Sequence, residues 1–232
     1  MKIALVIPSY KPHFMYLRRL CESIAQQTRL PDLVIIRASS CDASERFSDV
    51  SGCQWPFPLT ILTTPNQQFP AQNRNEGVDA VPPDFDVVSF FDSDDFMHPR
   101  RLEIVESLFL EGAEAVFHDC QKGSGMPVWD TYDAPRVVWN SILLQKESVG
   151  MTAEVIYRPI PMDEELEEQL GGTFGHISVS RSIFRRIRFD HAALIYVDNA
   201  ALGYEDIVFA SQIVREGYRT ATIRACLSYY YK

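Results

Sequence analysis

The sequence predicts an α/β protein in which a mostly parallel central sheet carries helices on both faces. Three observations support this fold class. Short apolar runs rich in β-branched and aromatic side chains are typical of strands buried on both faces. Segments of helical length and amphipathic pattern separate these runs. Polar residues gather directly after several of the runs, where parallel strands would end and where such sheets bind ligands.

The first half of the chain alternates strands with helices. We expect strands at residues 3–7, 33–37, 59–64, 86–91 and 113–119. We expect helices at about 14–27, 71–80 and 99–111. Parallel neighbours need a crossover connection, usually a helix, so this order predicts a sheet covered on both sides.

The second half is less regular. Residues 121–172 contain glycines, prolines and an acidic run, DEELEEQL at 163–170, which we interpret as a solvated helix face. A strand leading into a short helix is expected at 174–184, a helix within 203–218 that begins at Glu205-Asp206, and a final strand in TATIRACLSYYYK. Because we find no linker, we predict a single domain over 1–232, with halves 1–118 and 119–232.

Composition limits the function classes. Hydrophobic residues make up 46% of the chain and charged residues 23%, as in an ordinary globular protein. The formal net charge of −9 argues against nucleic-acid binding as the main activity.

The cysteines and the apolar segments bear on the cellular compartment. Five cysteines are scattered without a CxxC pair, which favours free thiols in a reducing compartment: Cys21, Cys41, Cys53, Cys120 and Cys226. The apolar start of the chain is too short for a secretory signal and is better interpreted as a strand. No segment is long enough to span a bilayer. We therefore expect a cytoplasmic protein, with peripheral association with a membrane as the open alternative.

An acidic cluster follows the strand predicted at 86–91. Asp92, Asp94 and Asp95 lie within four positions, and their charges repel one another unless a cation or several hydrogen-bond donors lie nearby. Capping of the helix predicted at 99–111 explains one acid, or two at most. A metal site is the other interpretation, because carboxylate oxygens are hard ligands that suit Mg²⁺ or Mn²⁺.

Four segments together resemble a known family. The stretches ALVIPSYKP…LRRLCESIAQQT, QNRNEG, FFDSDDFMHPRRL and GYEDIVFASQIVREGYR are similar, in order and spacing, to family 2 glycosyltransferases of the GT-A fold. Each motif alone is weak. The resemblance covers nearly the whole chain and is weakest at 121–172. It implies a single GT-A domain that transfers a sugar from a nucleotide-diphosphate donor, by inversion, to a hydroxyl of a glycan or other acceptor.

The resemblance also implies roles for individual residues. Asp92 would face the donor ribose, Asp94 would bind Mn²⁺ or Mg²⁺, and Asp95 would support or cap. The donor nucleotide would contact Pro8, Ser9, Tyr10, Arg37, Arg74, Asp92, Ser93 and Asp94. Arg74 could equally be an exposed helix residue, and Tyr10 a packing residue. The donor would occupy the half 1–118, and the acceptor and the catalytic base the half 119–232.

A second acidic pair provides the catalytic candidates. The family counterpart of Asp206 is the general base that deprotonates the acceptor, and Glu205 would support it or touch the acceptor. Acids are also favoured at helix N-termini for electrostatic reasons alone, so that alternative stays open. We expect the same helix N-terminus to keep Asp206 ionised, as a base must be.

The sequence departs from the family pattern at two places. Where relatives carry an acidic pair that reads the donor base, this chain has Arg37 and Ala38, so the donor is not expected to be restricted to uridine. The histidine that many relatives place near the C-terminus as a metal ligand is replaced by SYYYK. His176 and His118 are the remaining candidates, and His176 could instead contact the acceptor.

Other functions remain as alternatives. A sugar nucleotidyltransferase would need a glycine-rich loop after the first strand, where this chain has PSYKPHF. An aspartate phosphatase would carry its DxD after the first strand rather than the fourth. A catalytically inactive glycosyltransferase-like binding module is the main alternative, since the family's first acidic pair is absent.

Overall fold

The computed structural model describes residues 1–42, 47–129, 135–140, 144–148, 155–159, 174–190, 194–197, 200–203 and 205–231. The predicted acidic helix face at 163–170 lies outside these residues. Within them, no helix is both long enough and apolar enough to cross a membrane. The five cysteines all lie in the described part, and none of them forms a disulfide there.

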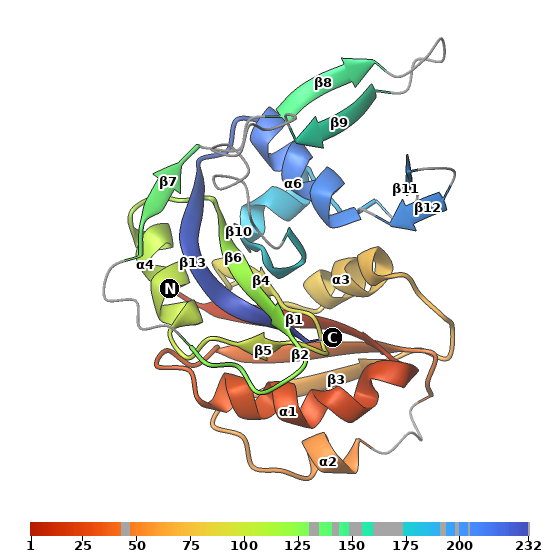
Figure 1. The fold of residues 1–232 in the computed structure, drawn as a ribbon. Coiled ribbons are helices and arrows are strands. Elements are labelled where there is room, and N and C mark those ends of the chain that lie inside the picture. Colours follow the sequence, from red (N-terminus) through yellow and green to blue (C-terminus); the bar gives the residue numbers. More distant parts are fainter. Residues whose placement is uncertain are drawn as a thin grey trace.

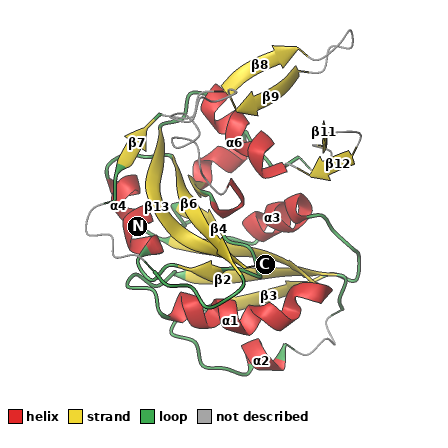
Figure 2. Cartoon of the chain, viewed as in Figure 1, coloured by secondary structure: helices red, strands yellow, loops and turns green. Residues whose placement is uncertain are grey.

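All strands and helices predicted for the first half are present (Figures 1 and 2). The strands are β1 (Ile3–Tyr10), β2 (Leu33–Ser39), β3 (Leu59–Thr63), β4 (Val87–Phe90) and β6 (Ala115–Gly123). The helices are α1 (Phe14–Ala25), α3 (Pro70–Asp79) and α4 (Arg101–Leu110), with a short extra helix α2 (Ser48–Ser51). The sequence therefore predicted this half well, apart from element ends.

The second half adds strands to the same sheet. The long strand β13 (Thr220–Tyr231) pairs in parallel with β6 and antiparallel with β5 (Phe96–Met97) and β7 (Val137–Trp139). Between β4 and β6 lies the short antiparallel strand β10 (Ser178–Ser180). Two hairpins stand apart from the sheet: β8 (Leu144–Ser148) with β9 (Val155–Pro159), and β11 (Leu194–Val197) with β12 (Ala200–Gly203).

The main sheet has the strand order β3-β2-β1-β4-β10-β6-β13-β5 and separates two apolar layers. One layer packs α1 and α4 against the sheet and includes Leu17, Leu102 and Val105. The other packs α3 and α6 (Glu205–Arg215) and includes Val78, Phe209 and Ile213. Figure 1 shows α1 and α3 on opposite faces. The predicted fold class, mostly parallel with helices on both faces, is confirmed.

Helix α3, which carries the predicted site residue Arg74, packs closely on β1. Gly77 lies on the sheet side of α3, and a Cβ built there would come within 2.4 Å of Val6 Cγ1. Val6 is fully buried in β1 and cannot move aside freely. Only a residue without a side chain therefore allows α3 to lie this close to the strand.

We predict that Gly77→Ala destabilises the protein by about 1–3 kcal/mol, because the overlap with Val6 outweighs alanine's better helix propensity. Urea unfolding measures the loss. Gly125→Ala is the matched control, since a Cβ at Gly125 meets nothing within 4 Å, and should stay within about 0.5 kcal/mol of wild type. Equal stability of the two variants would contradict the packing of α3 on β1.

Candidate active site

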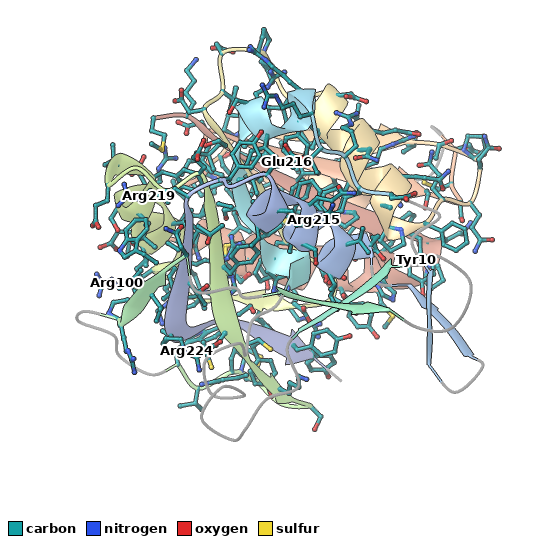
Figure 3. The ribbon with its side chains drawn as sticks, turned by 90° about the horizontal axis from the view of Figure 1, so that it is seen from above. Tyr10, Arg100, Arg215, Glu216, Arg219 and Arg224 are labelled. Carbon is teal, nitrogen blue, oxygen red and sulfur yellow. The ribbon has the colours of Figure 1, made fainter. Side chains whose placement is uncertain are left out.

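A cavity of about 930 Å³ lies where β1 and β4 end. Its size is that of a small-molecule site. Every predicted donor-binding or catalytic residue except Arg37 lines it, and so does His176; these residues are Pro8, Ser9, Tyr10, Arg74, Asp92, Ser93, Asp94, His176, Glu205 and Asp206. Seen from above, Tyr10 lies beyond one end of α6, away from Arg215 and Glu216 at its C-terminal end (Figure 3). Segments far apart in the sequence thus meet at the carboxyl ends of the strands.

Arg74 joins two of these segments. It lies in α3 with only 3% of its surface exposed. Its Nη2 donates to Asp92 Oδ1 at 2.9 Å and its Nη1 to Glu205 Oε1 at 2.6 Å. Burial would lower the pKa of Arg74, but Asp92, Glu205 and Asp206 outweigh it, and the pKa is raised. The alternative of an exposed helix arginine is therefore wrong.

Asp92 and Asp206 approach each other across Gly175. A Cβ built on Gly175 would lie 3.0 Å from Asp92 Oδ2 and 3.7 Å from Asp206 Oδ2. Burial acts to raise the pKa of Asp92, yet Arg74 and His176 together bring it down to about 2. Asp92 is therefore ionised at neutral pH.

Asp206 occupies the first turn of α6 and is less strongly stabilised as an anion. Its Oδ1 accepts the backbone N–H of Ile207 at 2.8 Å. Burial raises the pKa of Asp206, and the nearby Arg74 offsets this only in part. Burial therefore outweighs the helix N-terminus in setting this pKa, and the expectation that Asp206 is ionised stays a prediction. A carboxylate with a raised pKa is a stronger base once ionised.

Asp95 and His176 meet beside Asp92. His176 Nε2 lies 3.0 Å from Asp95 Oδ2 and 3.6 Å from Asp92 Oδ2. Both Nε2 and the Asp95 oxygen are buried, and neither makes a hydrogen bond of good geometry within the described residues. Burial would lower the pKa of His176, but the two carboxylates outweigh it and raise it. The three side chains can present one ligand atom each within 4.8 Å of one another, so the group favours a positive charge.

Asp94, the expected metal ligand, is not a member of this group of three. Its Oδ2 faces His13 Nδ1 at 3.6 Å. Its backbone carbonyl accepts a hydrogen bond from Arg19, whose guanidinium packs 4.0 Å from the Tyr231 ring. Burial and the neighbouring Asp95 raise the pKa of Asp94. Asp94 therefore faces the cavity from a loop that α1 and β13 hold in place.

Helix α4 is not capped by the acidic cluster. Among the described residues, Arg100 N–H donates to His98 Nδ1 at 3.1 Å, and Leu102 N–H donates to Gln27 Oε1 at 3.1 Å. Asp95 instead points inward and accepts the Tyr231 N–H at 2.9 Å. The capping interpretation was therefore wrong, because a histidine and a glutamine satisfy the helix start.

The fully buried Arg101 hydrogen-bonds to the backbone of the site residue His176. Arg101 donates to His118 Nε2 at 2.8 Å and to the backbone carbonyl of His176 at 2.6 Å. Burial lowers the pKa of Arg101 to about 9 and that of His118 well below its ordinary value. His118 Nε2 must accept this bond, so the neutral ring carries its proton on Nδ1, beside the Asp119 carbonyl. His118 therefore holds Arg101 and does not line the cavity.

Arg37 is the predicted donor-binding residue that does not line the cavity. Its Nε donates to Glu76 Oε2 on α3 at 2.7 Å. The structure also adds lining residues that the sequence argument missed: His13, Gln67, Gln68, Phe69, Pro70, Asn73, Cys120, Lys122, Gly175, Ile207 and Tyr230. Some of them are sequence neighbours of the motif residues, as Asn73 is of Arg74. This position beside a motif was the only sign in the sequence that they could line the cavity.

Residues 4–188 match the family model for Glycosyl transferase family 2, and the chain belongs to this family. It is 30% identical over 224 residues to "Succinoglycan biosynthesis protein ExoW" of Rhizobium meliloti (strain 1021). That match covers 92% of this chain and 65% of the ExoW protein, so the chain spans about two thirds of its relative.

The fold is similar to that of S. aureus TarS. The structure of TarS 1–349 matches with a TM-score of 0.64 and 15% identity, over 100% of this chain and 60% of that one. A structure of TarS 1–349 in complex with UDP-GlcNAc matches with a TM-score of 0.61 and 15% identity, over 100% of this chain and 59% of that one. At this identity the likeness shows the fold alone, and it confirms the GT-A class.

Proposed function

We propose that this chain is an inverting glycosyltransferase that moves a sugar from a nucleotide-diphosphate donor to a hydroxyl of a glycan or other acceptor. One observation carries the proposal: Arg74, Asp92, His176, Glu205 and Asp206 line one cavity, although they come from four distant segments. Family membership supports it. So do the name of ExoW, a succinoglycan biosynthesis protein, and the TarS complexes with UDP and UDP-GlcNAc.

Asp206 is the proposed general base. During attack, its free carboxylate oxygen takes the proton of the acceptor hydroxyl while the hydroxyl oxygen bonds to the anomeric carbon. The bond from this carbon to the diphosphate oxygen breaks, and the nucleoside diphosphate leaves with the electron pair. Single displacement needs no enzyme nucleophile, and it inverts the anomeric centre. Arg74 fixes Glu205, and so holds the start of α6 beside the donor segment.

A divalent cation, Mn²⁺ or Mg²⁺, is the proposed cofactor. The donor set fits it, because Asp95 Oδ2 and His176 Nε2 are buried beside Asp92 and lie 3.0 Å apart, yet neither makes a hydrogen bond of good geometry in the described part of the chain. Two carboxylates and an imidazole suit Mn²⁺, and carboxylates suit Mg²⁺. Asp92, Asp95 and His176 would hold the ion, with Asp94 as the ligand that the family motif implies. When bound, it would neutralise charge on the diphosphate.

We predict that Asp206→Asn lowers the rate of donor turnover by roughly 10²–10⁴-fold, because it removes the proton acceptor. Release of nucleoside diphosphate from a panel of nucleotide sugars with Mn²⁺ measures this, with water as the acceptor. The wild-type rate should rise with pH through the raised pKa of Asp206, since only the ionised form accepts a proton. Its acid limb should lie at higher pH than for an ordinary aspartate.

Glu205→Gln is the neighbouring control and should impair the chemical step less than Asp206→Asn, while nucleotide binding survives in Asp206→Asn. A rate for Asp206→Asn within a few-fold of wild type would contradict the assignment. Wild-type protein that binds nucleotide with Mn²⁺ but releases no diphosphate from any donor would favour the inactive binding module.

The metal proposal predicts that His176→Gln and Asp94→Asn each weaken the Mn²⁺-dependent binding of UDP by at least about tenfold. Calorimetric titration with and without Mn²⁺ gives the metal-dependent part. Asp119→Asn is a control outside the cavity, where Asp119 lies 3.5 Å from Arg224. Weaker UDP binding in His176→Gln alone would assign the ion to the group of Asp92, Asp95 and His176. Weaker UDP binding in Asp94→Asn alone would assign it to the ligand that the family motif implies. Unchanged binding in both variants would contradict the metal site.

A further inference from the structure

Three polar side chains on one wall of the cavity have buried oxygen atoms without a partner. Ser9 and Asn73 are 3% and 2% exposed, and Gln68 is half-buried. Ser9 Oγ, Gln68 Oε1 and Asn73 Oδ1 are all buried, and none makes a hydrogen bond to a described residue. Buried polar atoms are normally satisfied, so this wall requires an explanation.

The orientation of the Asn73 amide is fixed by its neighbours. Its Nδ2 donates to the Ser9 carbonyl at 3.2 Å and to Ser39 Oγ at 3.1 Å. The carbonyl can only accept, so the nitrogen must face it and both amide hydrogens are used. Asn73 Oδ1 is therefore an acceptor left open, with no donor hydrogen remaining on this side chain.

Gln68 is fixed in the same way, through Arg37. Its Nε2 donates to Glu76 Oε1, and Glu76 Oε2 accepts from Arg37. A carboxylate next to a cation is an acceptor only, which places the amide nitrogen of Gln68 toward Glu76. Gln68 Oε1 is left as a second open acceptor. Arg37 thus contributes to the cavity indirectly, although it does not line it.

This wall differs in chemistry from the rest of the cavity. Asp92, Glu205 and Asp206 bring negative charge to the cavity, whereas Ser9, Gln68 and Asn73 are neutral. Two exposed aromatic rings adjoin the neutral part, Phe69 at 67% and Tyr10 at 39% exposure. A flat, neutral, aromatic group bearing N–H donors matches this wall, and in a nucleotide sugar that group is the base.

We infer that Asn73 and Gln68 select the donor by accepting hydrogen bonds from a ring N–H of its base, an inference that rests on the proposed function. Uracil, thymine and guanine carry such an N–H. Cytosine and adenine present an unprotonated ring nitrogen at the matching position, which repels an amide oxygen, and only their exocyclic amino group can donate. A site built to pair a donor rejects a ligand without it more strongly than an apolar pocket can.

Two pairs of nucleoside diphosphates test the contribution of the base alone, because the members of each pair differ only in the base. UDP and CDP share ribose, diphosphate and ring size, and so do GDP and ADP. With Mn²⁺ present, wild-type protein should bind UDP at least about tenfold more tightly than CDP, and GDP more tightly than ADP. Titration calorimetry of the full chain measures the four dissociation constants.

Asn73→Ala and Gln68→Met each remove one acceptor. In each variant the ratio of the CDP to the UDP dissociation constant should fall toward one, because UDP binds less tightly while CDP does not. Gln26→Met is the matched control, since Gln26 is exposed at the end of α1 and does not line the cavity. Asn73→Ala also removes the hydrogen bonds that the Asn73 amide donates to the Ser9 carbonyl and to Ser39 Oγ. Gln68→Met therefore decides the question if Asn73→Ala does not fold.

The outcomes separate the two proposals. A UDP preference that falls in the variants and persists in Gln26→Met supports the acceptor wall. Binding of all four diphosphates with equal affinity, or a preference that Gln68→Met and Asn73→Ala leave intact, overturns the wall and leaves the proposed transferase standing. Failure of every diphosphate to bind with Mn²⁺ would overturn both.

Discussion

The candidate site depends on the ion pairs of one buried arginine. Removing a guanidinium from water is costly, and Arg74 is stable inside the protein only because Asp92 and Glu205 both contact it. These residues lie 18 and 131 positions away along the chain. The same cost therefore draws the loop after β4 and the start of α6 toward α3. The residues proposed to bind the donor and to accept the proton are brought together by this one cation.

Much of this arrangement could be predicted from local patterns. Apolar runs separated by amphipathic helices predicted β1 to β4, and parallel strands must present their carboxyl ends along one edge. That rule alone is enough to place Pro8–Tyr10 near Asp92. The acidic pair Glu205-Asp206 was predicted to start a helix, and it does. In these cases a short stretch of sequence contains the whole physical reason.

Other features depend on partners that no local pattern reveals. A strand within 174–184 was predicted and is present as β10, but its antiparallel place between β4 and β6 is set by its pairing with those two strands. Asp95 looked like a helix cap, but His98 and Gln27 satisfy the start of α4, so the carboxylate turns inward to His176. Arg37 was expected at the nucleotide, whereas Glu76 on α3 binds it. Each of these outcomes is set by tertiary packing.

The unfolding free energies of four proteins test the role of Arg74 most directly: wild type, Arg74→Met, Glu205→Gln and the double variant. A double-mutant cycle isolates the pairwise term between the guanidinium and the carboxylate. The account predicts that the two substitutions are coupled by about 1–3 kcal/mol, because either one alone leaves a buried group without its partner. Additive effects, with coupling below about 0.3 kcal/mol, would contradict the claim that this arginine assembles the site.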